Sequence, residues 1–581
     1  MSKKGKNKNA AMYQGTGAKV GRVSALVMVV IWILFAALMY YLFLPAMNVH
    51  SVGMWLYVIL VLMAPATCLI MLWYGIYKPY TYQGNGIAKP AGIALLGTFA
   101  VLVLLGICSL TGAKIFHAQS YASIMQPQEC VFTEDLDQAS AVSQIALMDT
   151  DSAILLGNRE IGSLSELVSQ YDVSENYSQI DYNGTPLKVS ALDYAGFFKY
   201  CGNKDNGVPG YVKVDPVGQN ATYVSLDTGM QYVPSAYFSK DLARHMRFQY
   251  PAKIFGNLHF EIDEDGKPFY VASVYDYTIG VFGGETVQGA IVCDAVTGES
   301  TYYDLAEVPR WVDMVFDGDL LAEQYNWYGK LSNGFMNSIF GKKGCKKCSE
   351  TVFYDEDGEE SYYGSNYGYV AKDGDIWIYT GVTSVNDDAS NIGFILSNER
   401  TGETHYYNIS GADESSAMSA AEGEVQEKGY QASFPSLINV DEQPTYIMVL
   451  KDASGIVKLY AMVNVESYNV VTTATTLDDC FKKYRALLGT DTAEESDEVA
   501  GQEVPEEPEE TVTVETESMT FVISRIQYAD VDGNTYVYYA DEAGTIYCQK
   551  FADDPTCMMR QEGDTITVEC ALENGVYRIY P

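Results

Sequence analysis

The sequence predicts a mixed α+β protein with three transmembrane helices at its N-terminus, an exterior of helices and hairpins, and a small β-barrel at its C-terminus. Three observations support this prediction. Three long apolar runs lie between Val23 and Gly112, a hairpin-like segment occurs twice in the middle of the chain, and short alternating segments follow an acidic linker. Apolar runs of about 20 residues can cross a bilayer as helices, whereas alternation is typical of strands.

The first apolar run extends from Val23 to Phe43, and the next two, Met54 to Tyr74 and Ala91 to Gly112, contain no charged residue. A cleaved signal peptide would have a shorter apolar core and would not precede two further runs of full length. Basic residues precede the first run and lie between the second and third, which orients the N-terminus toward the cytoplasm. We therefore expect a multi-pass protein of the cell membrane, with a basic cytoplasmic tail over 1–22, three transmembrane helices over 23–112, and an extracytoplasmic remainder.

Charge is divided unevenly along the chain. Eight of the 37 Lys and Arg residues precede residue 113, where no acidic residue occurs, so 29 basic and 75 acidic residues lie beyond it, a net charge of −46. This exterior is a poor partner for nucleic acid, because phosphate backbones bind surfaces of the opposite sign. The 46 tyrosines suit strand surfaces, and glycan stacking is the alternative use of so many phenol rings.

We expect the exterior to begin with an α+β domain over 113–250. Helical spacing favours helices over Ser163–Tyr171, Ala191–Tyr200 and Ser239–Phe248, and alternation favours strands over Tyr211–Val214 and Ala221–Leu226.

An internal repeat follows this domain. Residues 290–305 read AIVCDAVTGESTYYDL, and residues 394–409 read FILSNERTGETHYYNI. In both, an apolar strand precedes Asp294 or Asn398, a Thr-Gly pair supplies a turn with positive φ at glycine, and a Tyr pair returns as a second strand. Strands are predicted before these hairpins at Pro268–Tyr275 and Asp375–Thr380, helices after them at Val308–Tyr325 and Asp413–Lys428, and a weaker third copy over 444–465.

The strand followed by Asp294-Ala-Val-Thr-Gly-Glu299 resembles the closing signature of the PepSY domain, a small helix-and-hairpin unit of bacterial envelope proteins and protease propeptides. The second copy departs from this signature, with Asn398-Glu-Arg in place of Asp-Ala-Val. The resemblance implies a binding or protease-modulating module without catalytic residues. We assign repeat one to 251–350 and repeat two, with a strand extension, to 365–489. The run from about 190 to 470 also resembles a family of uncharacterised bacterial membrane-anchored proteins, which implies a location in the envelope.

Between the two copies lies a basic segment, GKKGCKKC, that ends at Cys348. Its cysteines, Cys345 and Cys348, could be idle thiols or a local disulfide, a redox pair whose thiol pKa the lysines lower, or part of a metal site. A structural zinc site needs about four ligands, and no second CxxC is present. We predict a binding surface around this segment that comprises Lys342, Lys343, Lys346, Lys347, Trp327 and Tyr328.

The sequence predicts no catalytic residue, cofactor site or metal site. The exterior histidines, His117, His245, His259 and His405, are not spaced as a metal pair, and no nucleophile elbow, phosphate-binding loop or HExxH helix occurs. Two converging carboxylates would suit glycoside hydrolysis, but the sequence does not single out a pair among the acids.

The C-terminal part begins with a short amphipathic helix at Leu477–Leu488 that Gly489 ends. An acidic linker over 490–517 follows and carries twelve acids and no base from Asp491 onward. Residues 518–581 then resemble a small OB-like β-barrel, a fold that binds oligonucleotides, oligosaccharides or proteins. Its predicted strands are Met519–Ile526, Thr535–Ala540, Thr545–Phe551, Thr565–Cys570 and Val576–Ile579.

Together these features predict a membrane-anchored, extracytoplasmic binding or scaffolding protein of the bacterial envelope without enzymatic activity. Modulation of an envelope protease or of cell-wall machinery is the expected role, with an integral attachment to the membrane, an envelope protein as partner and glycan as a further ligand. Two alternatives stay open: an envelope enzyme that acts on glycans or peptides, and a thiol redox sensor that uses Cys345 and Cys348.

Overall fold

The computed structural model describes residues 27, 29–72, 88–137, 150–215, 220–349, 353–354, 360–361, 367–385, 390–489, 517–531, 534–541, 545–550, 557, 560, 563–573 and 576–580. The chain forms two compact parts, an N-terminal part up to Glu494 and a C-terminal part from Glu495. The mixed α+β class is confirmed. The predicted cytoplasmic tail and most of the acidic linker lie outside the described residues.

Apolar helices occupy the three predicted apolar runs. They are an unlabelled helix at Val29–Phe43, α2 (Val52–Leu72) and α3 (Ala88–Thr111), followed by α4 (Lys114–Ala122). Over the residues described, no single helix is both long and apolar enough to cross a membrane, although the bent pair Leu96–Thr111 and Lys114–Ala122 meets that requirement by length and composition. Three transmembrane helices therefore stay a prediction.

The described residues between 150 and 474 repeat one plan four times, in which a helix precedes an antiparallel sheet. Unit one contains α6 (Thr150–Gly162), β2 (Tyr171–Val173), β3 (Ser178–Tyr182), β4 (Thr185–Tyr194), β5 (Val208–Asp215) and β6 (Asn220–Met230), with α7 (Phe197–Asn203) between β4 and β5. Unit two contains α8 (Leu242–Gln249), β7 (Ile254–Ile262), β8 (Pro268–Ile279), β9 (Gly283–Asp294) and β10 (Ser300–Asp304). Unit three contains α9 (Gly318–Leu331), β11 (Lys346–Cys348), β14 (Gly368–Lys372), β15 (Asp375–Ser384), β17 (Gly393–Asn398) and β18 (Thr404–Tyr407). Unit four contains α10 (Glu414–Gly423), β20 (Gln431–Ala432), β21 (Ser436–Val440), β22 (Gln443–Lys451), β23 (Val457–Asn464) and β24 (Val471–Ala474), and α11 (Leu477–Leu488) follows it.

Strand pairing is the same in each unit. The long second strand lies between the first and third strands, and the fourth strand pairs with the third. In three units the first strand is in two pieces, since β2, β11 and β20 pair with the end of the second strand whereas β3, β14 and β21 pair with its start. In unit two, β7 covers both positions with a bulge between Phe255 and Leu258. The hairpin duplicated in the sequence thus belongs to a larger plan, which unit one also follows.

Neighbouring sheets pack face to face, so the second strands of the inner units contribute to two cores each. In β15, Trp377 and Tyr379 lie in the core shared with unit four, whereas Ile378 and Val382 lie in the core shared with unit two. In β8, Val271 lies in the core shared with unit three, and the residues on either side of it lie in the core shared with unit one. Because successive side chains of a strand point to opposite faces, both faces are buried and the strands are apolar almost throughout.

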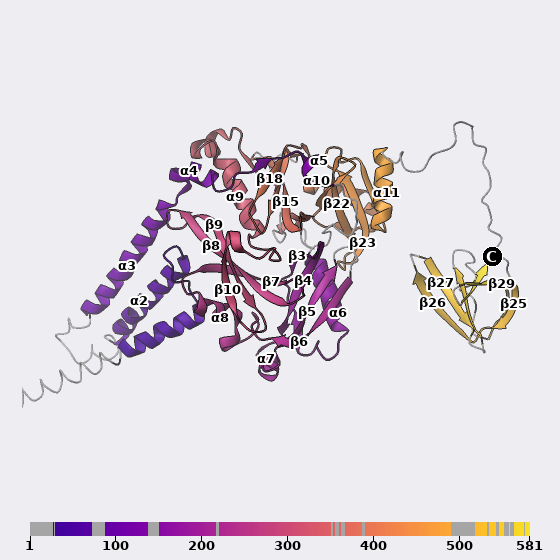
Figure 1. The fold of residues 1–581 in the computed structure, drawn as a ribbon, viewed down its shortest axis with the longest axis horizontal. Helices are drawn as coiled ribbons and strands as arrows, with labels where there is room; N and C mark the ends of the chain where they lie inside the picture. The colour runs from indigo at the N-terminus through magenta and orange to yellow at the C-terminus, as the bar shows by residue number, and fades with distance from the viewer. Residues whose placement is uncertain are drawn as a thin grey trace, which may run out of the picture. The chain divides into compact units, whose positions relative to one another are not determined.

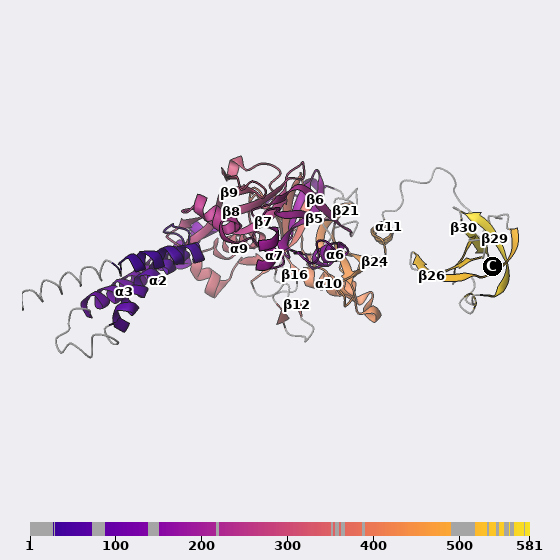
Figure 2. The ribbon, with the colours of Figure 1, turned by 90° about the horizontal axis from the view of Figure 1, so that it is seen from below.

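The stack of sheets also curves back on itself. Lys188 Nζ in β4 lies 5.1 Å from the ring centroid of Tyr369 in β14. A Cβ atom on Gly455, in the β22–β23 turn, would lie 2.7 Å from Leu155 Cδ1 in α6. Unit one therefore approaches units three and four, and the four sheets surround a common centre. Figure 1 shows the magenta strands of units one and two below the salmon and orange strands of units three and four, and Figure 2 shows α2 and α3 extending from one end of this body.

The two predicted hairpin turns have the same hydrogen bonds. The carboxylate of Asp294 accepts from the N–H groups of the second and third residues after it, at 2.8 and 3.0 Å, and the side-chain oxygen of Asn398 does the same at 2.9 Å. Gly298 and Gly402 have φ of 79° and 75°, as the sequence predicts. The hairpins at β9–β10 and β17–β18 are therefore confirmed.

Three of the predicted helices are wrong in whole or in part. Ser163–Tyr171 forms turns that lead into β2, and Ala191–Tyr200 holds the end of β4 and the start of α7. The reason in the second case is that Ala191 and its neighbours belong to a buried strand, where the apolar spacing of a helix and of a strand cannot be told apart. The helix expected over Val308–Tyr325 begins only at Gly318, because the Asp317 side chain caps it there by accepting from the Asp319 N–H at 3.0 Å. The helices predicted at Ser239–Phe248, Asp413–Lys428 and Leu477–Leu488 are confirmed in α8, α10 and α11.

The C-terminal part forms one six-stranded sheet in the order β25-β29-β30-β28-β27-β26, in which β28 and β30 are parallel and the other neighbours antiparallel. Its strands are β25 (Glu517–Val522), β26 (Arg525–Val531), β27 (Asn534–Ala540), β28 (Ile546–Lys550), β29 (Thr565–Glu573) and β30 (Val576–Tyr580). Ile523 donates its N–H to Asp564 O at 2.9 Å, and Ser524 donates to Ala540 O at 2.8 Å. The consecutive edge strands β25 and β26 therefore form one bent strand that joins both edges of the sheet. The predicted strand Met519–Ile526 is thus observed as two strands.

We predict that Gly402→Ala destabilises the four-unit body. A Cβ atom there would lie 2.8 Å from Phe316 Cζ, and alanine would also have to adopt the positive φ. Backbone strain of this kind costs about 1–3 kcal/mol. The measurement is the thermal unfolding midpoint of the purified full chain, with Gly423→Ala as control, because Gly423 ends α10 with open space around it. Equal midpoints for the two variants would contradict the prediction.

Candidate functional site

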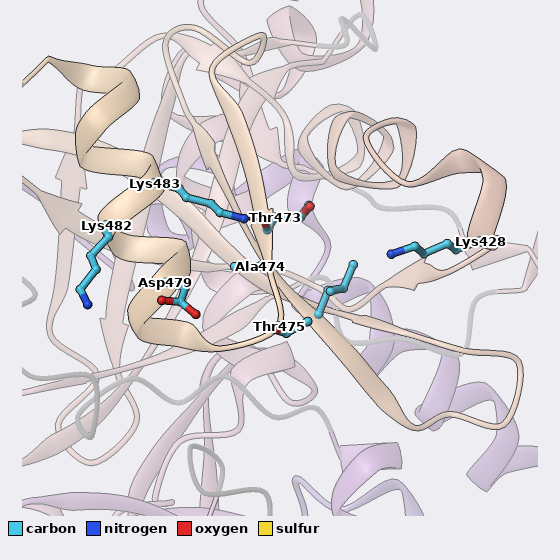
Figure 3. Close-up of a pocket in the computed structure, with 8 residues that line it drawn as sticks. Lys428, Thr473, Ala474, Thr475, Asp479, Lys482 and Lys483 are labelled. Atoms are coloured by element: carbon cyan, nitrogen blue, oxygen red, sulfur yellow. Dashed lines mark hydrogen bonds between the residues drawn. The ribbon is translucent and has the colours of Figure 1, made fainter. Parts of the chain in front are cut away.

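An open pocket of about 400 Å³ lies in unit four beside α11. It is lined by Lys428, Leu459, Thr473, Ala474, Thr475, Asp479, Lys482 and Lys483. Figure 3 shows Lys428 on one side of the pocket and the α11 side chains on the other, with Thr473 and Ala474 between them. Three lysines thus surround one pocket of a chain whose net charge is −38.

Some polar groups of this pocket already have partners. Lys483 Nζ donates to Thr473 O at 3.2 Å. The hydroxyl of Thr476, which caps α11, donates to Asp479 Oδ2 at 2.7 Å. The lining has three lysines and a single acid, Asp479, so the pocket has an excess of positive charge. The pocket therefore suits a small anionic group such as a phosphate or a carboxylate, which lysine binds as a point charge.

A second candidate site lies where the chain first reaches unit three. The strand β1 (Gln128–Glu129) pairs with β18 in parallel, and the Cys130 N–H donates to Tyr406 O at 3.0 Å. The short helix α5 (Phe132–Asp135) then carries Asp135 to His405, whose Nδ1 lies 2.7 Å from Asp135 Oδ2. The ligand atoms of Cys130, Asp135 and His405 all lie within 4.8 Å of one another.

These three residue types could form a thiol nucleophile with its base, or they could hold a metal ion. A nucleophilic cysteine needs a lowered pKa or a free base beside it. Here burial, and then the charge of Asp135, raise the pKa of the Cys130 thiol. His405 also has carboxylates at both ring nitrogens, with Nε2 3.1 Å from Glu403 Oε1. The arrangement therefore fits metal ligation better than nucleophilic catalysis.

Buried acids lie at the centre of the four units. Glu261 in β7 accepts from the N–H groups of Asp313 and Met314 at 2.9 and 3.1 Å, and Asp313 Oδ2 accepts from the Asp181 N–H of unit one at 2.7 Å. Glu261 and Asp313 are at most 1% exposed. Their contacts hold the connection between units two and three at the centre, so we interpret them as structural.

Burial dominates the electrostatics of this centre. It raises the pKa of Glu261 to about 7, and it raises the pKa of Asp313 well above its usual range with help from the nearby charge of Glu261. Both oxygens of Glu399 are buried and accept no hydrogen bond within the described residues. Burial, followed by the nearby charges of Asp317 and Glu261, raises the pKa of Glu399 well above its ordinary value.

The predicted redox pair lies at the start of the unit-three sheet. Cys345 and Cys348 are both buried and both unpaired, and Cys348 Sγ lies 3.6 Å from Ala322 O. Burial raises the pKa of the Cys348 thiol, which is the opposite of the shift that the neighbouring lysines were expected to cause. A redox role for this pair stays a prediction.

The predicted binding surface is divided among different surroundings. Lys342 and Lys343 are exposed, whereas Lys346 Nζ donates to the Tyr406 hydroxyl at 3.0 Å. Trp327 is buried against α4, with its ring centroid 5.0 Å from that of Tyr121, and lines a pocket of about 180 Å³. The remaining members, Lys347 and Tyr328, are half-buried, the latter against the core between units two and three. Of this set only Lys342 and Lys343 are exposed.

Sequence reasoning missed both the lysine pocket and the group of Cys130, Asp135 and His405. Lys482 and Lys483 adjoin on the predicted helix at 477–488, but Lys428 lies in a different segment. Asp135 and His405 are 270 residues apart, so no local spacing could connect them. The pairing of β1 with β18 brings these residues together and is visible only in the fold, so the sequence offers no signal for this group.

In comparisons with known proteins, no protein-family model matches the chain and no curated protein is significantly similar to it. The resemblance to PepSY domains therefore stays a prediction.

The raised pKa of Glu261 predicts a stability that falls as the pH rises. The folded state keeps the proton up to about pH 7, whereas an exposed glutamate loses it near its ordinary value of 4.5. The stabilisation is fully present below pH 4.5 and is lost as the pH rises through 7, with a change of roughly 3 kcal/mol at most.

The measurement is the thermal unfolding midpoint of the full chain at several pH values between 4.5 and 8, which gives the slope of stability against pH. Glu261→Gln should make this slope smaller. The matched control is Glu264→Gln, three residues away on an exposed turn, which should keep the wild-type slope. The same slope in both variants would assign the pH dependence to other groups.

Proposed function

We propose that this chain is a membrane-anchored, extracytoplasmic binding or scaffolding protein of the bacterial envelope, without enzymatic activity of its own. The single observation that carries the proposal is the attachment of the apolar helices to unit two. After the helix at Val29–Phe43, Met47 donates its N–H to Pro251 O at 2.7 Å, and the Asn48 amide donates to Ala252 O at 3.0 Å. His50 Nδ1 lies 2.8 Å from Val281 O, in the β8–β9 turn.

The end of α3 reaches the same turn. Tyr121 donates its hydroxyl to Gly112 O at 2.6 Å. A Cβ atom on Gly112 would lie 2.9 Å from Ile279 O, and one on Gly280 would lie 2.6 Å from Gly112 N, so only glycines allow this approach. The helices are thus fixed to a sheet of the body at two points, which is what a rigid membrane anchor requires.

Two groups of exposed apolar side chains lie at these attachment points and support a face that touches the bilayer. The first group adjoins the helix at Val29–Phe43, where the rings of Phe248 and Tyr40 have centroids 5.8 Å apart. Its exposed members are Phe197, Phe198, Phe238 and Phe248. The second group lies on α4 and after α9, elements that contact each other. Its members are Ile115, Phe116, Met336, Ile339 and Phe340.

The charges beside the second group also fit a lipid surface. Lys342 and Lys343 are exposed and follow Phe340 by two and three residues. Apolar side chains that enter the acyl boundary beside lysines that meet anionic headgroups are the usual composition of an interfacial membrane contact. The basic cluster predicted as a binding surface is therefore proposed to contact lipid.

The C-terminal part is proposed as the recognition domain. Its strand order, with a bent first strand, a three-stranded meander and a parallel pair between the third and fifth strands, supports the predicted OB-like β-barrel. The acidic exterior argues against nucleic acid, so an envelope protein is the proposed partner and glycan the alternative ligand.

The enzyme alternative has less support. Glycoside hydrolysis needs two carboxyl groups beside a cleft that admits the sugar. Among the described residues, the convergent acids Glu261 and Asp313 are buried at the centre of the four units, and the pocket beside α11 contains Asp479 as its one acid.

We predict that residues of both apolar groups touch lipid. Phe198→Cys and Phe340→Cys, each labelled with bimane in a Cys201→Ser background because Cys201 is exposed, should be quenched by nitroxide-bearing lipids in reconstituted vesicles. Ser454→Cys is the control, because Ser454 is exposed on the β22–β23 turn of unit four and should escape quenching. Equal quenching at all three positions, or none at residues 198 and 340, would contradict the proposed face.

We also predict that the C-terminal part recruits the partner. Crosslinking in cells should capture an envelope protein with the full chain, and that protein should be lost when Thr511–Pro581 is removed. The truncated chain must remain in the membrane fraction at wild-type abundance, which serves as the control. A partner that both chains retain would place recognition on the four units, and recovery of no partner from abundant, inserted protein would oppose scaffolding.

A further inference from the structure

The group formed by Cys130, Asp135 and His405 combines a thiol, a carboxylate and an imidazole from two segments of the chain. All three ligand atoms lie within 4.8 Å of one another, and His405 is 7% exposed while the other two are half-buried. We propose that this group is a zinc site that fastens the segment after α4 to unit three. The proposal does not rest on the membrane or scaffolding role.

The donor set decides the class of metal. Thiolate and imidazole are ligands of Zn²⁺ and of other late first-row metals, whereas Ca²⁺ and Mg²⁺ take oxygen ligands. One sulfur, one nitrogen and one oxygen leave a fourth tetrahedral position for water or an exchangeable ligand. Zn²⁺ is therefore the expected ion, and Co²⁺ is its spectroscopic substitute.

The surroundings of His405 match those of a metal-bound histidine. Its Nδ1 faces Asp135 Oδ2 at 2.7 Å, while Nε2 lies 3.1 Å from Glu403 Oε1. A ligating histidine commonly donates its second N–H to a carboxylate, which fixes the ring and its tautomer. Glu403 would fill that role for a Zn²⁺ ion bound at Nδ1.

The other neighbours of the group are consistent with zinc binding. Tyr407 donates its hydroxyl to Asp135 Oδ2, and so orients the carboxylate. Lys372 Nζ lies 3.4 Å from Asp135 Oδ1 but only 2.7 Å from Asp373 Oδ2, so it keeps an acidic partner when a cation approaches Asp135. The Cys130 thiol must lose its proton to bind the ion, and affinity should therefore rise with pH.

The position of the group gives the ion a mechanical role. Cys130 and Asp135 belong to the segment that connects α4 to the body. His405 belongs to β18, which lies between β1 and β17 in the sheet. This segment contacts β18 through two ladder positions, at Gln128 and Glu129, and through the hydrogen bond from the Cys130 N–H to Tyr406 O. A zinc ion would add a strong cross-link at its end.

The test is a Co²⁺ titration of the purified full chain in detergent, read by thiolate-to-cobalt charge transfer and by the visible bands of tetrahedral cobalt. One equivalent should produce both signals, and Zn²⁺ should abolish them. Cys130→Ser should lose the charge-transfer band, and Glu403→Gln should bind about 10- to 100-fold more weakly. Cys201→Ser, at an exposed thiol in unit one, should keep the wild-type titration.

The CxxC pair supplies the decisive comparison. A Cys345→Ser, Cys348→Ser variant should keep the signal if the proposal is right. Loss of the signal in that variant with retention in Cys130→Ser would transfer the site to the CxxC pair and overturn the proposal, as would the absence of any charge-transfer band in the wild type. Thermal midpoints without metal show whether each variant folds, and a Zn²⁺-dependent rise in the midpoint should occur in the wild type and disappear in Cys130→Ser.

Discussion

The burial of both faces of the inner sheets is the constraint on which the rest of this structure depends. A strand such as β15 places Trp377 and Ile378 in two different cores, so its sheet needs a neighbour on each side. Each repeat therefore cannot stand alone, and repeats of this kind are stable only as a stack with covered ends. Here α11 covers the outer face of unit four through Leu477, Phe481 and Tyr484, and it also carries Lys482 and Lys483 of the pocket.

The parts of the fold that could be predicted from the sequence are those in which a turn has its own chemistry. Asp294 and Asn398 each accept two backbone N–H groups, and a glycine with positive φ follows, so both hairpins are visible in the residues alone. Unit one escaped notice because its β5–β6 connection reads VDPVGQNATYV and lacks the Thr-Gly-Glu triplet. Its buried strand β4 was mistaken in part for a helix, since apolar spacing does not distinguish the two when both faces are covered.

The candidate sites could not be predicted because their residues come from segments that only packing brings together. Trp327 and Tyr328 illustrate the opposite error, in which neighbours in the sequence were assigned to one surface. Successive residues of a helix point about 100° apart, so Trp327 packs against α4 while Tyr328 lies beside the core between units two and three. The lysines around the CxxC pair predicted a lowered thiol pKa, but burial raises the pKa of the Cys348 thiol and outweighs the opposing charge of Lys330.

The attachment of the apolar helices to the middle of the stack has a consequence for how the molecule could work. Pro251, Val281 and Gly280 belong to unit two, and the segment after α4 pairs with β18 of unit three. The apolar helices are thereby connected to the two inner units, whose sheets are buried on both faces. The same segment also contacts unit four, where the Asn439 side chain donates to Leu136 O at 2.8 Å. A ligand that binds the pocket beside α11 would therefore meet a unit that this segment already connects to the apolar helices, and a zinc ion at Cys130, Asp135 and His405 would stiffen the connection on the side of unit three.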